Sequence, residues 1–439
     1  MKIFVLSMGC AKNTADSEHL IALLKAAGHE IIDEAVKADA AIINTCGFIL
    51  DAVKENIDAI LDLEELKNSG KIKKLIVLGC LVNRYEKNLR EEFSSVDLFA
   101  RSEEWEKIIK FLGGDFNQNC KVIAPAIDKR FWSRYLKVSE GCNTLCSYCA
   151  IPLIRGRLRS VPLKNLIDEA LMLCAAGAKE LCLVGQDLTV YGADIDDENI
   201  NLKTLIHELD RELPKGTWLR LLYLHPNRVN EDLIDFLMSH EKVLHYLDIP
   251  IQHVDSEILK AMNRPCPEGH MEKIFKYIRG VDDLFTLRTT IMTGFPGETR
   301  ENFEKVLDFL SEIEFDHLGV FSYSREEGTP AAKLKKRVLK EIAEQRCSEV
   351  LNLQSEIASQ RSSLFDGREL EILIERFDRQ DGELVAVGRS FRDAPEIDGV
   401  VLVDGFNKDK LAKKFKPGDV IRAKIESSIE NDLFGKVID

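Results

Sequence analysis

The chain has 439 residues, 45% of them hydrophobic, so it can bury a large core and is expected to divide into about three domains. Acidic residues outnumber basic ones by 74 to 60, which excludes the broad positive field that nonspecific nucleic-acid binding depends on. No charged leader or bilayer-length apolar stretch is evident, so we expect a cytoplasmic protein without a membrane partner. In that reducing compartment, clusters among its eleven cysteines indicate metal or redox ligands rather than disulfides.

Residues 1–115 alternate short apolar runs with stretches of helical period, which predicts an α/β domain with a small doubly wound parallel sheet. Three of the apolar runs, KIFVLSMGC, DAAIINTCG and KLIVLGC, carry a cysteine where the strand should end: Cys10, Cys46 and Cys80. The carboxyl ends of parallel strands share one edge of a sheet. We therefore expect these three cysteines to lie close together.

A linker is predicted over residues 113–134, where helical and strand periodicity both disappear. In residues 130–365, six apolar runs then alternate with helices, which predicts a partial (βα)6 barrel resembling a TIM barrel, with a trailing helix. Active sites of such barrels lie at the carboxyl ends of the strands. The polar residues that follow the predicted strands are Gln186, Asp187, His225, Gln252, His253, Glu298, Tyr323 and Ser324.

The last segment, residues 366–439, is rich in short β runs and turns, which predicts a small antiparallel β-barrel. Residues 368–439 contain 13 Lys or Arg against 16 Asp or Glu, so this barrel lacks the basic character expected of an RNA-binding module. The Lys408–Lys416 cluster could form a local basic patch, although a solvated helix face is the better interpretation.

The clearest motif is EGCNTLCSYCAIP, which places Cys142, Cys146 and Cys149 with C-x3-C-x2-C spacing just after the first barrel strand. Three thiolates on one loop can each bind one corner of a cubane iron–sulfur cluster, and the fourth iron then stays open to a substrate. A structural zinc site commonly takes four ligands, and neither a second cysteine pair nor a spaced histidine pair lies nearby in the sequence. The spacing therefore favours a cluster over zinc.

These three cysteines, with Tyr148 before the third, resemble the signature of the radical S-adenosylmethionine (SAM) superfamily. The resemblance implies a 4Fe-4S cluster whose open iron binds the amino and carboxylate groups of SAM. It also implies one-electron cleavage of SAM to a 5′-deoxyadenosyl radical, which abstracts hydrogen from unactivated carbon.

The same resemblance makes four further residues candidates for contacts with SAM. Gln186 and Asp187 would contact its methionine part, and their alternative role is to cap a strand end. Gly294 and Glu298, in the run GFPGE, would lie beside its adenosine, and their alternative role is an ordinary turn.

Singly, Cys10, Cys46 and Cys80 are typical of small buried core residues. Together with the barrel motif and the final β-barrel, they resemble the methylthiotransferase family, whose C-terminal module is the TRAM barrel. This resemblance implies a second 4Fe-4S cluster on the three N-terminal cysteines, where sulfur is methylated by one SAM while another SAM yields the radical. The remaining cysteines are interpreted as structural: Cys120, Cys174, Cys182, Cys266 and Cys347.

Several segments resemble the RimO-type branch of that family, which modifies the β-carbon of an aspartate in the twelfth small-subunit ribosomal protein: SMGCAKNTADSE, EGCNTLCSYCAIPLIRGRLRS, GQDLTVYGAD and LRTTIMTGFPGET. The tRNA-modifying branch usually shows a Gln-Met pair where this chain has Ala11 and Lys12. The implied partners are that ribosomal protein or the small ribosomal subunit, and an electron donor such as a flavodoxin or ferredoxin. The alternatives are a tRNA adenosine methylthiotransferase and a non-catalytic iron–sulfur or zinc-binding module.

Overall fold

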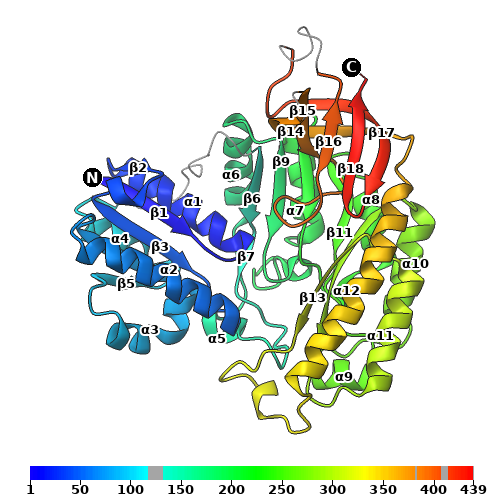
Figure 1. Ribbon diagram of the computed structural model, residues 1–439, viewed down its shortest axis with the longest axis horizontal. Coiled ribbons are helices and arrows are strands. Elements are labelled where there is room, and N and C mark those ends of the chain that lie inside the picture. The colour runs from blue at the N-terminus through cyan, green and yellow to red at the C-terminus, as the bar shows by residue number, and fades with distance from the viewer. Residues whose placement is uncertain (117–131, 381–382, 407–413, 439) are drawn as a thin grey trace.

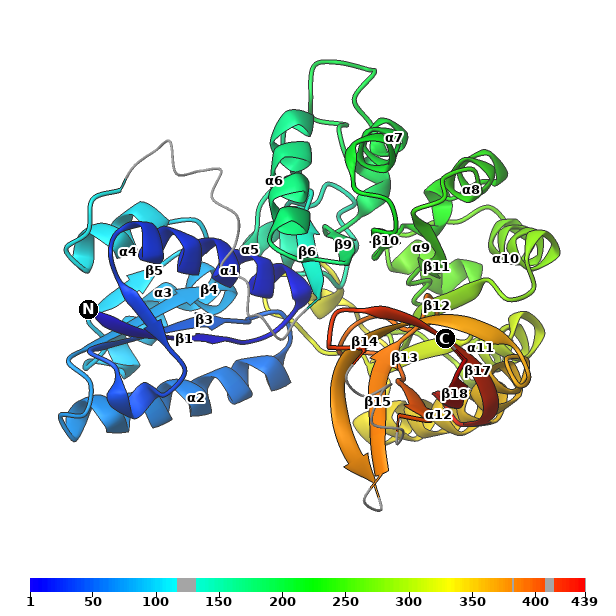
Figure 2. The same cartoon turned by 90° about the horizontal axis from the view of Figure 1, so that it is seen from above.

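The computed structural model describes residues 1–116, 132–380, 383–406 and 414–438 of the chain. They form three units in chain order, with the N-terminal unit beside the central one and the C-terminal barrel at one end of it (Figures 1 and 2). The linker residues 117–131, Cys120 among them, and residues 408–413 of the Lys408–Lys416 cluster lie outside the described residues. Among the described residues, no helix is long and apolar enough to cross a membrane.

The N-terminal unit is a five-stranded parallel sheet in the order β2-β1-β3-β4-β5, as its alternating pattern predicts. Its strands are β1 (Lys2–Ser7), β2 (Glu30–Ile32), β3 (Ala40–Thr45), β4 (Lys74–Gly79) and β5 (Leu98–Ala100). The helices are α1 (Ala11–Ala26), α2 (Leu50–Asn68), α3 (Cys80–Glu92) and α4 (Trp105–Phe111). Helices α1 and α4 pack on one face of the sheet, and α2 and α3 pack on the other. In a sheet of this strand order, ligands bind where the order reverses, between the carboxyl ends of β1 and β3.

The central unit is an open sheet of six parallel strands in the order β13-β12-β11-β10-β9-β6, which confirms the predicted partial barrel. Its strands are β6 (Ser133–Lys137), β9 (Glu180–Val184), β10 (Trp218–Leu221), β11 (Val243–Asp248), β12 (Thr286–Thr293) and β13 (His317–Ser322). The helices outside it are α6 (Leu163–Ala175), α7 (Leu202–Glu212), α8 (Glu231–Met238), α10 (His270–Val281), α11 (Arg300–Ile313) and α12 (Lys340–Ser363). They follow one another around the outer face of the sheet (Figure 2). Shorter elements at the carboxyl ends of the strands are β7 (Ser139–Glu140), β8 (Arg159–Ser160), α5 (Ile151–Ile154) and α9 (Ser256–Ala261).

The C-terminal unit is a closed five-stranded barrel in the order β14-β15-β16-β18-β17. Its strands are β14 (Glu369–Gln380), β15 (Glu383–Arg389), β16 (Val401–Asp404), β17 (Val420–Ile429) and β18 (Asp432–Val437). The barrel itself was predicted, but one pairing corrects the expectation of a purely antiparallel sheet. Strand β16 pairs with β18 in parallel, because closure of the barrel brings the last strand beside β16 in the same direction.

The small barrel covers the amino ends of the central strands through buried ion pairs. Arg389 at the end of β15 and Arg220 in β10 both bind Glu180, the first residue of β9, at 2.7 and 2.6 Å. Arg288 in β12 pairs with Asp398 of the barrel at 3.3 Å. The barrel therefore blocks one end of the central sheet, and the carboxyl end is left for the site.

Candidate active site

The three N-terminal cysteines follow neighbouring strands of the first sheet. Cys10 precedes α1 after β1, Cys46 comes directly after β3, and Cys80 begins α3 after β4. The loop before α1 approaches Cys46 so closely that a Cβ atom on Gly9 would lie 2.6 Å from the Cβ of Cys46, and Gly9 has a φ of +96°. Glycine at this position therefore lets the β1–α1 loop bring Cys10 beside Cys46.

The second triad lies on the loop between β7 and α5 of the central unit. Two hydrogen bonds attach this loop to the end of α9: Ser147 N–H donates to the Met262 carbonyl at 2.8 Å, and the Asn263 amide donates to the Leu145 carbonyl at 2.8 Å. The loop carrying Cys142, Cys146 and Cys149 is thus held from a strand end and from a helix. Its geometry does not depend on the loop residues alone.

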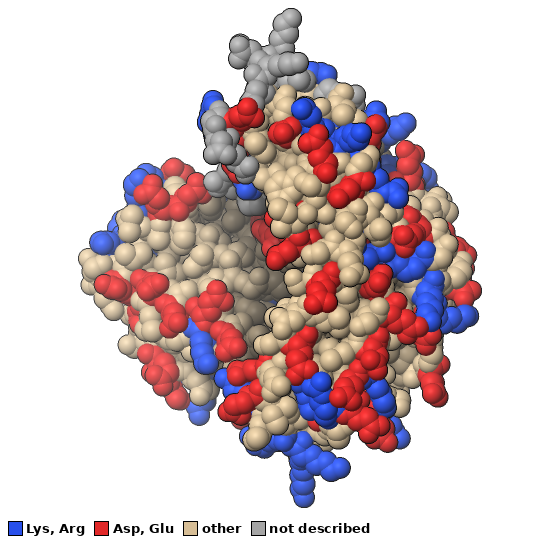
Figure 3. Space-filling view, turned by 45° about the vertical axis from the view of Figure 1, so that its right-hand side comes forward, with Lys and Arg blue, Asp and Glu red and all other residues tan. Residues whose placement is uncertain are grey.

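The structure brings all six cysteines to one cavity of about 350 Å³ between the N-terminal and central units. The surface of the molecule is hollowed between these two units (Figure 3). Tyr148, Gln186 and Asp187 also line the cavity, as do the strand-end residues His225 and Gln252. Among the described residues, Lys12, Arg155, Tyr223 and Arg264 line it as well.

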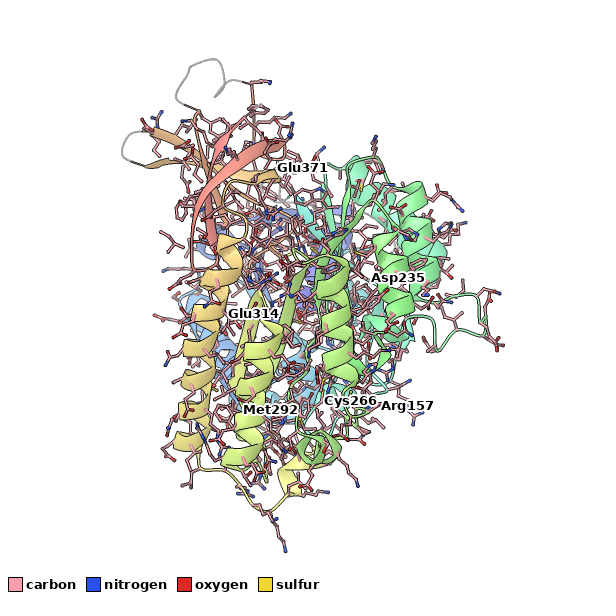
Figure 4. The ribbon with its side chains drawn as sticks, turned by 90° about the vertical axis from the view of Figure 1, so that its right-hand side faces the viewer. Arg157, Asp235, Cys266, Met292, Glu314 and Glu371 are labelled. Atoms are coloured by element: carbon pink, nitrogen blue, oxygen red, sulfur yellow. The ribbon has the colours of Figure 1, made fainter. Side chains whose placement is uncertain are left out.

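All ten cysteines in the described part of the chain are free. Four of them, interpreted from the sequence as structural, lie outside the cavity lining: Cys174, Cys182, Cys266 and Cys347. Cys182 is fully buried in the inner face of β9, and Cys266 packs against the hydrophobic core at the lower end of the view in Figure 4.

The described residues do not form a site for a single metal ion. Among the described residues, no three His, Cys, Asp or Glu side chains converge on a single metal-ion position. A cubane binds each thiolate through a different iron, so its ligands are spaced more widely than those of one ion. The structure therefore gives no support to the alternative of a zinc-binding module.

A buried ionic network connects the N-terminal triad to the central unit, with Arg155 at its centre. The Arg155 guanidinium donates to Cys80 Sγ at 3.1 Å, to Asp16 and Glu140 at 2.8 Å each, and to Asn13 Oδ1 at 2.6 Å. Lys137 also pairs with Asp16 and, at 3.1 Å, with Glu140. Burial by itself would raise the pKa of Glu140, but Lys137 and Arg155 outweigh it and lower that pKa to about 2. The network ties α1 to the loop that follows the second triad.

Burial also sets the acidity of the thiols. It raises the pKa of Cys80 to about 11, even though Arg155 opposes it, and the pKa of Cys149 to about 12. At Cys10, burial acts in the same direction, but the Lys12 ammonium and the Asn13 N–H outweigh it and lower the pKa. Metal ligation requires thiolates, and a coordinating metal ion deprotonates its thiol ligands outright, so cluster binding does not depend on these neighbouring cations.

Several cavity atoms have unused hydrogen-bonding capacity, as a polar ligand would require. In the described part of the structure, Gln186 Oε1, His225 Nε2 and Gln252 Oε1 are buried without a partner. His225 is neutral, because burial and the neighbouring Arg264 and Arg228 lower its pKa to about 2. Arg264 itself lies 3.5 Å from Cys146 Sγ. Unpaired polar atoms beside a cation fit the amino acid and nucleoside parts of SAM.

Asp187 caps a strand end and also lines the cavity. Its carboxylate caps the 3-10 helix Leu188–Val190 by accepting from Thr189 N–H at 3.0 Å, and it pairs with Arg228 at 2.6 Å. It also faces the cavity. Strand-end capping therefore positions the carboxylate, and the cavity gives it access to a ligand.

Gly294 and Glu298 are not among the cavity-lining residues, and their contact with the adenosine of SAM stays a prediction. Glu298 is buried and pairs with Arg346 of α12. Gly294 has a φ of +72°, and a Cβ atom there would lie 2.4 Å from the Cβ of Ala343 in the same helix. The GFPGE turn consequently holds α12 against the central sheet.

Comparison with known proteins identifies the family to which the chain belongs. Models of three families match successive parts of the chain: the uncharacterized protein family UPF0004 at residues 2–100, the radical SAM superfamily at residues 136–310 and the TRAM domain at residues 367–438. A protein named ribosomal protein uS12 methylthiotransferase RimO from Aquifex aeolicus is 41% identical over 99% of this chain and 97% of its own length. The protein of the same name from Natranaerobius thermophilus is 38% identical over 100% of this chain and 99% of its own length.

The chain belongs to the RimO family of radical SAM methylthiotransferases. As a RimO-family protein it is an enzyme that uses SAM and an iron–sulfur cluster. A solved radical SAM methyltransferase, TsrM from Kitasatospora setae, shares the fold with a TM-score of 0.54 at 16% identity over 78% of each chain.

Reasoning from the sequence missed three basic residues that line the cavity: Lys12, Arg155 and Arg264. Arg155 is one of three arginines in IRGRLR, and Arg264 comes four residues after Lys260, so both resemble ordinary exposed basic residues, as does Lys12 at the start of a helical stretch. No local signal distinguishes them.

Proposed function

We propose that this RimO-family chain transfers a methylthio group to the β-carbon of an aspartate side chain in ribosomal protein uS12. The observation that carries the proposal is that both cysteine triads open into one cavity. A transfer of this kind needs the radical and the sulfur donor to reach the same substrate carbon. The relatives named for this activity match the chain over nearly its whole length.

In this proposal, Cys142, Cys146 and Cys149 hold one 4Fe-4S cluster, and Cys10, Cys46 and Cys80 hold a second. When bound, the two clusters and SAM supply the hydrogen-abstracting radical and the methylated sulfur that the transfer needs. A flavodoxin or ferredoxin as electron donor and a cytoplasmic location stay predictions.

The chain's own residues position these groups. Gln186, His225 and Gln252 present buried, unpaired atoms. These atoms can bind the polar groups of SAM beside the triad that begins at Cys142. Arg155 donates a hydrogen bond to Cys80 Sγ and holds the N-terminal unit against the central one. Since hydrogen bonds to cluster sulfurs influence reduction potential, Arg155 would also adjust the reduction potential of the cluster held by Cys10, Cys46 and Cys80.

The test is an anaerobic assay of the reconstituted enzyme with SAM and a strong reductant. Ribosomal protein uS12 and bulk tRNA are offered in parallel, and both are read by mass spectrometry. We expect a methylthio adduct on one uS12 aspartate and about eight irons per chain, as two cubanes require. An adduct confined to tRNA would contradict the substrate, and a single cluster would contradict the assignment of the N-terminal triad.

A further inference from the structure

Lys12 places an ammonium group in the cavity beside the N-terminal triad. It lies in the first turn of α1, two residues after Cys10, and its side chain is half-buried. Its Nζ donates to the Gly185 carbonyl at 3.3 Å and lies 4.4 Å from the centre of the Tyr223 ring. The ammonium is thus held between the first helix of the N-terminal unit and the strand ends of the central unit.

The other cations that line the cavity are already committed. Arg155 is paired with Asp16 and Glu140, each at 2.8 Å. Arg264 donates to the Pro250 carbonyl at 2.9 Å and lies beside Cys146 of the other triad. Arg264 is therefore placed for a ligand of the SAM cluster, and Arg155 for a structural role.

Lys12, in contrast, has no carboxylate within ion-pairing distance among the described residues. Glu140 is the carboxylate whose charge acts on it, but that group is bound by Lys137, Arg155 and Gln186. An ammonium group has three donors, and only the Gly185 carbonyl accepts from Lys12 in the described structure. Cations withdrawn from water are normally paired. The remaining donors and the charge of Lys12 are available to an anionic ligand in the cavity.

We infer that Lys12 forms a carboxylate-binding subsite that receives the side-chain carboxylate of the substrate aspartate. The inference rests on the proposed function and identifies how that function selects its substrate. The reacting β-carbon is bonded directly to the carboxylate carbon, so the carboxylate must lie beside the sulfur donor. Lys12 occupies that position because it shares the β1–α1 segment with Cys10. An adenosine base carries no carboxylate, so it would leave the charge of Lys12 without this partner.

The experiment compares wild type, Lys12→Met, Lys12→Arg and a control, Lys25→Met, all as full-length, cluster-loaded enzyme. Lys25 lies exposed in the last turn of the same helix, far from the cavity. Each protein is offered uS12 and a uS12 variant in which the target aspartate is asparagine. Binding is measured without reductant, and methylthio adducts and 5′-deoxyadenosine are measured with it.

Truncating one partner of a desolvated ion pair weakens binding by at least about 30-fold. We therefore expect Lys12→Met to lose at least about 30-fold in affinity for uS12 and to bind the aspartate and asparagine forms equally. Lys12→Arg should keep the preference for aspartate, because it keeps the charge. Iron content and substrate-free SAM cleavage should stay at the wild-type level in every variant, and Lys25→Met should match wild type throughout.

The subsite is overturned if Lys12→Met still prefers the aspartate form as strongly as wild type does. It is also overturned if this variant loses iron or SAM cleavage in parallel with binding, since Lys12 would then support the clusters. Failure of the proposed function looks different, because wild type would then form no adduct on uS12 whatever the binding data show.

Discussion

Replacing Arg155 with methionine tests whether the buried network really joins the two units that share the cavity. The substitution removes charge-assisted hydrogen bonds to Asp16 and Glu140 and leaves both carboxylates buried. Lys137 still neutralises part of their charge, because it pairs with both. Breaking a buried ion pair by removing one partner costs about 3–5 kcal/mol, so we expect about 3 kcal/mol for Arg155→Met.

The assay is urea unfolding of the full-length protein under reducing, anaerobic conditions, followed by tryptophan fluorescence. The matched control is Arg159→Met, four residues further along the chain. Arg159 pairs with Glu103 at 2.8 Å, but its side chain is 61% exposed, so this loss should cost at most about 1 kcal/mol. If Arg155→Met cost no more than Arg159→Met, the network would not stabilise the contact between the units.

Three further predictions follow from the same geometry. Cys142→Ala should abolish 5′-deoxyadenosine formation. Cys10→Ala should keep 5′-deoxyadenosine formation and lose the methylthio adduct on uS12. A full yield of adduct from both variants would contradict the division of roles between the triads. The pKa of Glu140 is lowered from 4.5 to about 2 in the folded state, so its stabilising effect is complete above the unfolded value and is lost as the pH falls from about 4.5 towards 2. Unfolding free energy should accordingly fall less between pH 6 and pH 3 in Glu140→Gln than in wild type, and an equal fall would contradict this. Gly9→Ala would place a Cβ atom 2.6 Å from the Cβ of Cys46 at a φ of +96°. We therefore expect a loss of about 1–3 kcal/mol in stability and reduced iron content, measured by urea unfolding and iron analysis. Wild-type values for both would contradict this expectation, because the loop would then accept the extra atom without strain.

The six cysteines could be selected from the sequence as candidate cluster ligands because the patterns that mark them are local. The spacing of Cys142, Cys146 and Cys149 lies within eight residues, and Cys10, Cys46 and Cys80 each follow an apolar run that reads as a strand. Parallel strands then bring such positions to one edge of the sheet without further information. The six strands of the central unit were predictable for the same reason, since apolar runs and helical periods alternate along the chain.

The partners of those cysteines depend on tertiary structure. Arg155 and Cys80 are 75 residues apart, and Lys12 and Gly185 are 173 residues apart, so no local pattern reports either contact. The packing of the GFPGE turn could not be predicted either. Its glycines indicate a turn, but the helix that packs on Gly294 begins only at Lys340.

The family, the order of the units and the strand-end positions of the cysteines could be predicted, since these depend on short motifs and strand periodicity. The packed structure was needed to see that both triads share one cavity, that Lys12 lines it and that the last barrel strand runs parallel to β16. These features arise where separate units pack or where a sheet closes. They depend on side chains that meet across long stretches of chain.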